Sequence, residues 1–335
     1  MDNLHLGNMK VSVLMSVYNE NPDFVTKAIR SILEQTLSEF EFLIYNDNPN
    51  DVVLDRLISS FQVSDSRIRY FRNDKNIGLA ASLNKGIRIA KADYIARMDA
   101  DDIAFPNRLE KQWNYLQAHE NVAVLGTWGC TIDENDLELY NIKNVCAHQD
   151  VFVRNIFSSQ LIHPSVMIRK STLSVGDFWY NESFACAQDY ELWSRLLLSG
   201  LVIENLPCIL MKYRLSSNQI TSRKRDLQLF YTRQIYQVLI KALFNFHPSS
   251  EDIETHLDCC LQGDVYSLWK KSTWLQKLNE SLPYDNLKER MREYTLLLLS
   301  QQKGFSFIDL IRYQCIFKRF SFYVMCSYIY HKVIR

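Results

Sequence analysis

Short apolar strands alternate with amphipathic helices along most of the first two thirds of this chain, and this alternation constrains the fold more than any other feature. Val11–Val17 is an apolar run rich in β-branched residues, as expected of a strand buried on both faces. Asn21-Pro22-Asp23 then predicts a helix start, with an N-cap, a proline at the first helical position and an acid in the first turn. Such alternation is typical of an α/β fold with a mostly parallel sheet and helices on both faces.

Polar clusters follow three of the predicted strands. They are Tyr18-Asn19, Asn46-Asp47 and the acidic run at 99–102. Ligands of parallel α/β sheets bind beyond the carboxyl ends of the strands, so we expect these clusters to form one ligand site. The further strands are predicted at 42–45, 68–71, 93–98 and 122–127, and the helices at 24–33, 52–61 and 79–90.

Composition excludes several classes of protein. Hydrophobic residues make up 47% of the 335 residues and charged residues 23%, which is typical of a folded chain. Lys+Arg and Asp+Glu are both 38, so there is no overall attraction to nucleic acid, and we expect no nucleic-acid partner. The 8 cysteines show neither paired nor zinc-site spacing. With no signal peptide and no long apolar run, we expect a cytoplasmic protein.

The hydrophobic pattern of the sequence changes after about residue 222, where helical periodicity continues and strand alternation ends. We therefore predict a first domain at 1–222 and a mainly helical region at 223–335. Its tail, 303–335, carries six Lys/Arg against one acid, Asp309, among many aromatic residues. Such a segment fits a membrane interface as well as it fits ordinary packing on the rest of the protein, and nucleic-acid binding is the least favoured alternative.

Asp99, Asp101 and Asp102 lie within four residues directly after a buried strand. Carboxylates this close repel one another, and a hard divalent cation removes that cost. The glycine and glutamate that an EF-hand loop requires are missing, so Mg²⁺ or Mn²⁺ shared with substrate phosphates fits better. Spacing alone supports equally a solvated acidic turn that caps the helix starting near Pro106.

Five segments in order resemble the family 2 glycosyltransferases, which have the GT-A fold, over about residues 11–215. The segments are VSVLMSVYNE at 11–20, SILEQTLSEFEFLIYNDNPND at 31–51, NIGLAASLNKG at 76–86, YIARMDADDIAFPNRL at 94–109 and AQDYELWSRL at 187–196. The resemblance implies nucleotide-sugar binding at about 11–105 and acceptor binding with the catalytic base at about 120–215.

The resemblance also implies the roles of individual residues. Asp99-Ala100-Asp101 matches the DxD motif, in which the last aspartate ligates a metal that bridges the donor diphosphate, and Asp102 either ligates through water or orients the loop. Asp47 matches the aspartate that hydrogen-bonds uracil, and Tyr18 matches the aromatic ring that stacks on the uracil. Taken alone, Tyr18 would fit a buried aromatic residue of the core better. Arg69 and Arg72 are candidates for contacts with the phosphates, but a solvated position on the surface fits the sequence equally well.

Asp189 matches the catalytic base of inverting members. The apolar stripe after it places Asp189 in the first turn of a helix, whose positive end favours the ionised form. A capping charge is the alternative. His163, in a His-Pro-Ser segment that the family places near the acceptor, is interpreted as structural.

Three residues depart from the family pattern. They are Asn46, Pro49 and Gln188, and the first two weaken the case for uridine. The Gln-x-x-Arg-Trp motif of processive synthases is missing, so we expect addition of one sugar.

The hypothesis is a metal-dependent, inverting hexosyl- or N-acetylhexosaminyl-transferase that uses a UDP-sugar. Its acceptor would be a glycan or lipid-linked oligosaccharide in bacterial surface polysaccharide synthesis, with peripheral membrane contact through the tail. The alternative is a catalytically silent nucleotide-sugar-binding subunit.

Overall fold

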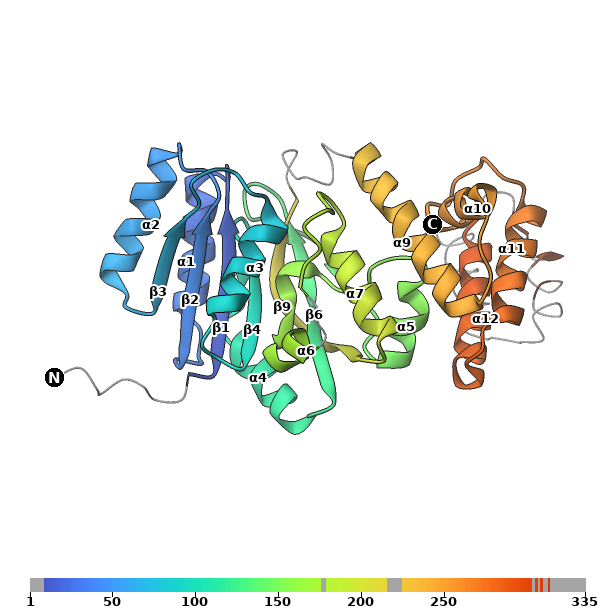
Figure 1. Cartoon of the computed structure of the whole chain (residues 1–335), viewed down its shortest axis with the longest axis horizontal. Helices are drawn as coiled ribbons and strands as arrows, with labels where there is room; N and C mark the ends of the chain where they lie inside the picture. The colour runs from blue at the N-terminus through green and yellow to red at the C-terminus, as the bar shows by residue number, and fades with distance from the viewer. Residues whose placement is uncertain are drawn as a thin grey trace. The chain divides into compact units, whose positions relative to one another are not determined.

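The computed structural model describes residues 9–175, 179–215 and 225–302, together with 305, 306, 308, 309 and 313 (Figure 1). Its contacts divide the chain into two units. The first contains Met1–Ala147 and Leu161–Arg225, and the second contains His148–Gln160 and Asp226–Arg335. The predicted boundary between residues 222 and 223 lies outside the described residues and stays a prediction.

The first unit is built on a sheet whose parallel part follows the predicted strands. The strands β1 (Val11–Val17), β2 (Phe40–Asn46), β3 (Ile68–Arg72) and β4 (Tyr94–Asp99) are parallel neighbours in the order β3-β2-β1-β4. The predicted α/β class with a mostly parallel sheet is confirmed for this part.

Beyond β4 the sheet is mixed. The short strand β8 (Met167–Arg169) runs antiparallel between β4 and the long strand β6 (Val122–Ile132). On its other side β6 is parallel to β9 (Val202–Arg214). Two further strands pair antiparallel with these long ones, β7 (Glu138–Ile142) with β6 and β5 (Ile103–Ala104) with β9.

Helices cover both faces of the sheet. On one face, α1 (Pro22–Leu33), α2 (Val52–Ser64) and α4 (Arg108–Ala118) share an apolar core with sheet residues such as Val13 and Met15. Leu14 points the other way, because side chains alternate along a strand. There α3 (Leu79–Ile89) packs so closely that a Cβ added to Gly86 would lie 2.1 Å from Leu14 Cδ1. Figure 1 shows α2 beside β3 at one edge.

The helix start predicted after β1 is confirmed in detail. Asn21 caps α1, its side chain accepting a hydrogen bond from the Asp23 backbone N–H at 2.9 Å, and Pro22 occupies the first turn. The first unit also contains the 3₁₀ turn η1 (His163–Ser165), α6 (Lys170–Val175) and α7 (Gln188–Leu198).

The second unit is helical, as predicted for the C-terminal region. It contains α5 (His148–Asn155), α9 (Arg225–Phe244), α10 (Ser250–Cys260), α11 (Leu268–Ser281) and α12 (Asp285–Ser300). Buried His256 joins these helices: its Nε2 donates to the Ile156 carbonyl at 3.0 Å and its Nδ1 accepts from Trp274 Nε1 at 3.1 Å. Burial lowers the His256 pKa to about 4, so the ring is neutral, as both bonds require.

None of the described helices is both long enough and apolar enough to cross a bilayer. The basic, aromatic tail at 303–335 falls almost wholly outside the described residues.

Candidate active site

The carboxyl ends of three parallel strands lie level at one edge of the sheet. Val17 of β1 is in register with Asn46 of β2, and Ser16 of β1 with Asp99 of β4. The residues that directly follow these strands therefore emerge side by side. The parallel register brings together the three polar clusters that the sequence places far apart.

The acidic run after β4 forms a compact cluster. The nearest carboxylate oxygens of Asp99, Asp101 and Asp102 all lie within 4.8 Å of one another. Arg214 of β9 holds this loop: its backbone N–H donates to Asp102 Oδ1 at 2.8 Å, and its Nε donates to the Asp101 carbonyl at 2.8 Å. Within the described part of the chain, the buried Oδ2 of Asp102 has no hydrogen-bond partner.

Burial and repulsion from neighbouring carboxylates raise the pKa values of Asp101 and Asp102. The pKa of Asp101 rises to about 7, first because the group is desolvated and then because Asp99 and Glu20 repel it. Asp102 is shifted in the same direction, by burial and then by Asp101 and Asp99. Oxygen ligands in mutual repulsion, one with an unpaired buried oxygen, fit a hard divalent cation such as Mg²⁺ or Mn²⁺.

Asp189 lies in the first turn of α7, as predicted. Burial raises its pKa, against the opposing effects of the Tyr190 and Asp189 backbone N–H groups and of Arg97. The helix end favours the ionised carboxylate, but desolvation outweighs it. Asp99 also acts electrostatically on Asp189, which ties the two carboxylates to one site.

Asp47 and Tyr18 stand at the strand ends in different environments. Asp47 is buried and accepts hydrogen bonds from Asn73 Nδ2 and the Ile77 N–H, both at 2.9 Å, and from the Gly78 N–H at 2.8 Å. These bonds close the loop before α3, and a uracil contact by Asp47 stays a prediction. Tyr18 is 42% exposed, so it is not the buried core aromatic of the alternative interpretation.

The residues considered for lesser roles are held by partners within the protein. His163 Nε2 hydrogen-bonds Tyr180 Oη at 2.8 Å, and burial lowers the His163 pKa, in keeping with a structural role. Arg69 pairs with Glu41 at 2.5 Å, and Arg72 with Asp55 at 3.2 Å.

The structure adds three residues that sequence reasoning missed. Glu20, which follows β1, repels the carboxylate of Asp101. Arg97 forms an ion pair with Asp99. Tyr213 of β9 lies in the electrostatic field of the acidic cluster and of Asp189. The period of two along β4 could have pointed to Arg97, because it places Arg97 and Asp99 on one face. The sequence offers no such signal for Tyr213.

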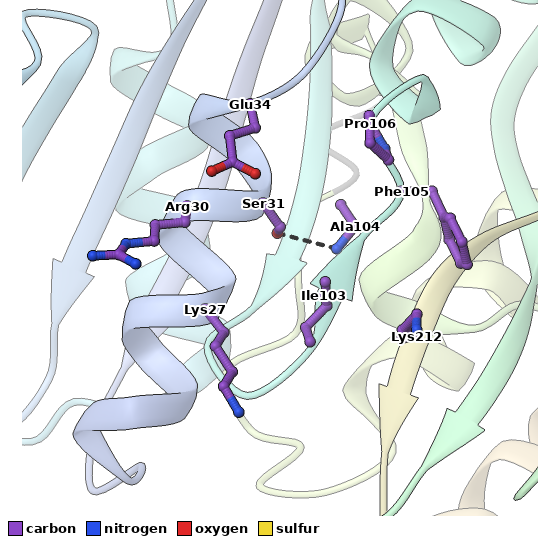
Figure 2. Close-up of a pocket in the computed structure, with 9 residues that line it drawn as sticks. All are labelled: Lys27, Arg30, Ser31, Glu34, Ile103, Ala104, Phe105, Pro106 and Lys212. Atoms are coloured by element: carbon purple, nitrogen blue, oxygen red, sulfur yellow. Dashed lines mark hydrogen bonds between the residues drawn. The ribbon is translucent and has the colours of Figure 1, made fainter. Parts of the chain in front are cut away.

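A pocket of about 330 Å³ opens beside this region and contains none of the predicted site residues. Figure 2 shows α1 on one side of it and the chain of β5 on the other, joined by a hydrogen bond from the Ala104 N–H to Ser31 Oγ at 3.1 Å. Two of its cations are already neutralised, because Lys27 pairs with Asp136 and Lys212 with Glu138. Its lining includes the carboxylate of Glu34 but none of the three aspartates of the acidic cluster, so this pocket is not the predicted metal site.

Comparison with known proteins shows which family this chain belongs to. The sequence model described as "Glycosyl transferase family 2" matches residues 12–176. An uncharacterized glycosyltransferase of Methanocaldococcus jannaschii is 35% identical over 226 residues, which are 66% of this chain and 77% of that protein. The chain belongs to glycosyltransferase family 2. A further relative is the amylovoran biosynthesis glycosyltransferase AmsE of Erwinia amylovora, 31% identical over 65% of this chain and 84% of its own.

Solved structures agree with the fold of this glycosyltransferase. TarS of S. aureus, residues 1–349, in complex with UDP-GlcNAc, superposes with a TM-score of 0.53 over 92% of this chain and 91% of its own, at 16% identity. At that identity the likeness concerns the fold, and it confirms the predicted GT-A architecture. The family match includes Tyr18, Asp47, Asp99 and Asp101, whereas Asp189 lies beyond it.

Proposed function

We propose that this glycosyltransferase moves one sugar from a UDP-sugar to a hydroxyl of a glycan or glycolipid acceptor, with inversion, in the synthesis of a bacterial surface polysaccharide. The observation that carries the proposal is the convergence of the Asp99–Asp101 pair and Asp189 on one electrostatically coupled site at the carboxyl ends of the strands. Ligand sites of α/β sheets form at such ends.

The proposal divides the site into two sides. On the donor side, Asp101 and Asp99 would hold Mn²⁺ or Mg²⁺, whose positive charge stabilises a departing nucleoside diphosphate. Arg214 fixes the backbone of the loop that presents these carboxylates. The exposed ring of Tyr18 offers a stacking surface for the base.

On the acceptor side, Asp189 acts as the general base. Its carboxylate takes the proton of the acceptor hydroxyl while the hydroxyl oxygen attacks the anomeric carbon, and the bond from that carbon to the diphosphate breaks. The single displacement inverts the anomeric centre, so an α-linked donor gives a β-linked product. The raised pKa of Asp189 makes it a stronger proton acceptor than an ordinary aspartate once it is ionised.

The comparisons support the choice of donor and acceptor class. TarS, which shares the fold, was solved with UDP-GlcNAc, and AmsE is named for the synthesis of amylovoran. A UDP-sugar donor and a polysaccharide product are the simplest classes consistent with both.

A donor screen tests the proposal. The purified protein with Mn²⁺ is offered UDP-, GDP- and dTDP-sugars, and release of nucleoside diphosphate is measured. We expect slow release from one UDP-sugar and loss of at least about 100-fold in Asp101→Asn, because the carboxylate beside the leaving group is lost. Chelation of divalent cations should have the same effect.

Asp93→Asn is the matched control, since Asp93 is exposed at the opposite end of β4. This variant should release nucleotide at the wild-type rate. Release that survives both Asp101→Asn and chelation would contradict the metal assignment. Metal-dependent UDP binding without release from any donor, even with acceptor glycans present, would favour the silent subunit.

A further inference from the structure

Arg97 is a buried cation directly beneath the acidic cluster. Its residue is 3% exposed, and it projects from β4 on the same face as Asp99, two residues later. The backbone of Arg97 is held on both sides: its N–H donates to the Val166 carbonyl at 2.9 Å, and its carbonyl accepts from Arg108 Nη2 at 2.7 Å. The guanidinium is therefore part of a built site.

The guanidinium of Arg97 has one ion-pair partner among the described residues. Its Nη2 forms an ion pair with Asp99 Oδ1, while Nε and Nη1 have no hydrogen-bond partner among the residues that the structure describes. A buried guanidinium is costly unless it is paired. Asp99 is consequently the carboxylate that keeps Arg97 stable inside the protein, and separating the two has a large energetic cost.

We propose that Arg97 is a positioning residue that competes with the divalent cation for Asp99, so that the protein binds the cation weakly alone and tightly only with a nucleoside diphosphate. Asp101, whose side chain forms no ion pair among the residues that the structure describes, then remains the principal carboxylate for the metal. The inference rests on the proposed function, because it takes the acidic cluster to be the metal site.

The negative charge of the nucleotide explains why it would strengthen binding of the divalent cation. Arg97 cancels part of the negative charge of the cluster, which weakens the attraction for a divalent cation. A diphosphate brings its own negative charge and oxygen ligands to the cation. Cation and nucleotide then raise each other's affinity by the same factor, as linkage requires.

The experiment measures Mn²⁺ binding by electron paramagnetic resonance, without and with UDP, in the full-length protein. Arg97→Met removes the charge at similar side-chain length. We expect its affinity for Mn²⁺ alone to rise about tenfold or more, because both the freed Asp99 and the lost positive charge act in this direction. The enhancement of Mn²⁺ binding by UDP should shrink correspondingly.

Three companion variants separate this role from a structural one. Arg97→Gln is neutral but can still hydrogen-bond Asp99, so it should also bind Mn²⁺ more tightly and serves if Arg97→Met fails to fold. Arg97→Lys keeps the charge and should stay within about threefold of wild type. Arg67→Met removes a comparable ion pair, with Asp65, away from the cluster and should leave Mn²⁺ binding unchanged.

The outcomes distinguish the inference from the function on which it rests. If wild type binds no Mn²⁺ even with UDP, the proposed function fails. If wild type binds Mn²⁺ with UDP but the neutral variants bind Mn²⁺ alone no more tightly than wild type, the competition is wrong and Arg97 merely supports the fold.

Discussion

At the scale of single residues, environment gives identical aspartates different properties. Asp47 is buried, yet two backbone N–H groups and an amide satisfy its carboxylate. Asp189 is desolvated, which outweighs the opposing charge of Arg97, and its pKa rises from its usual value of 3.8. Only an aspartate of the second kind suits a general base that must accept a proton near neutral pH.

The first residue-scale prediction concerns Asp189→Asn. The amide cannot accept the acceptor proton, so transfer should fall by about 10²- to 10⁴-fold while UDP and Mn²⁺ binding persist. In wild type, because the pKa is raised, the protonated and inactive form persists to higher pH than in an ordinary aspartate. Transfer should therefore be lost as pH falls through this raised pKa, which a pH profile of kcat/KM measures.

Glu191→Gln is the matched control for this prediction. Glu191 lies in the same turn of α7 but forms an ion pair with Arg195 at 2.8 Å, so its loss should change transfer less than about threefold. Near wild-type transfer by Asp189→Asn would remove Asp189 from the role of base.

At the scale of elements, buried polar side chains of α4 link the helix to the strands around the site. Gln112 is fully buried: its Nε2 donates to the carbonyls of Leu125 at 2.8 Å and Ser165 at 2.9 Å, and its Oε1 accepts from Arg108 Nε at 3.0 Å. Arg108 in turn holds the carbonyl of Arg97. The helix thereby fixes the end of β4 that carries the acidic cluster.

Gln112→Leu tests this linkage. The substitution keeps the approximate volume but leaves Arg108 Nε and two carbonyls without this partner. We expect a loss of about 2–4 kcal/mol in the free energy of unfolding, measured by urea denaturation, because buried unsatisfied groups cost about 1–3 kcal/mol each.

Gln117→Leu is the control on the same helix. Gln117 is exposed, and its Nε2 donates to Tyr94 Oη at 2.8 Å, so its loss should cost less than about 1 kcal/mol. Equal losses of unfolding free energy in the two variants would show that the buried hydrogen bonds of Gln112 do not account for its contribution to stability.

At the scale of the whole molecule, the helical unit takes one of its helices from the middle of the chain. Helix α5 and the residues up to 160 interrupt the first unit and pack in the second, where Phe157 is 1% exposed and its carbonyl accepts from Tyr236 Oη. A chain ending at residue 225 would leave Phe157 and Ile156 uncovered.

The prediction at this scale concerns the tail, which we propose contacts the membrane. A chain ending at 302 loses the six Lys/Arg of residues 303–335 but keeps α9 to α12. Each basic residue near an anionic surface is worth about 1 kcal/mol, so this chain should shift from membranes to the supernatant in sedimentation with anionic vesicles.

The chain ending at 225 is the contrast. It should aggregate, because the apolar side of α5 and the residues after it loses its cover. The chain ending at 302 also loses the buried Phe305 and Tyr313, but it keeps α9 to α12 and should keep most of the helical circular dichroism. A chain ending at 302 that is folded and still sediments with vesicles would contradict membrane contact by the tail.

The amino-acid sequence was sufficient to predict the parallel strands, the helices between them and the family. These follow from local apolar periodicity, from caps such as Asn21-Pro22, and from motifs of contiguous residues, all of which are properties of short segments. Local patterns also indicated Asp99 and Asp101, because they directly follow a predicted strand, and the family resemblance added Asp189.

Which groups face one another, and how far they are desolvated, became apparent only from the packed structure. The antiparallel strand β8, the membership of 148–160 in the helical unit, and the approach of Arg214 and Glu20 to the acidic cluster all depend on contacts between distant segments. Such contacts leave no local period. The pKa values at the site follow chiefly from burial, which exists only once these segments have packed.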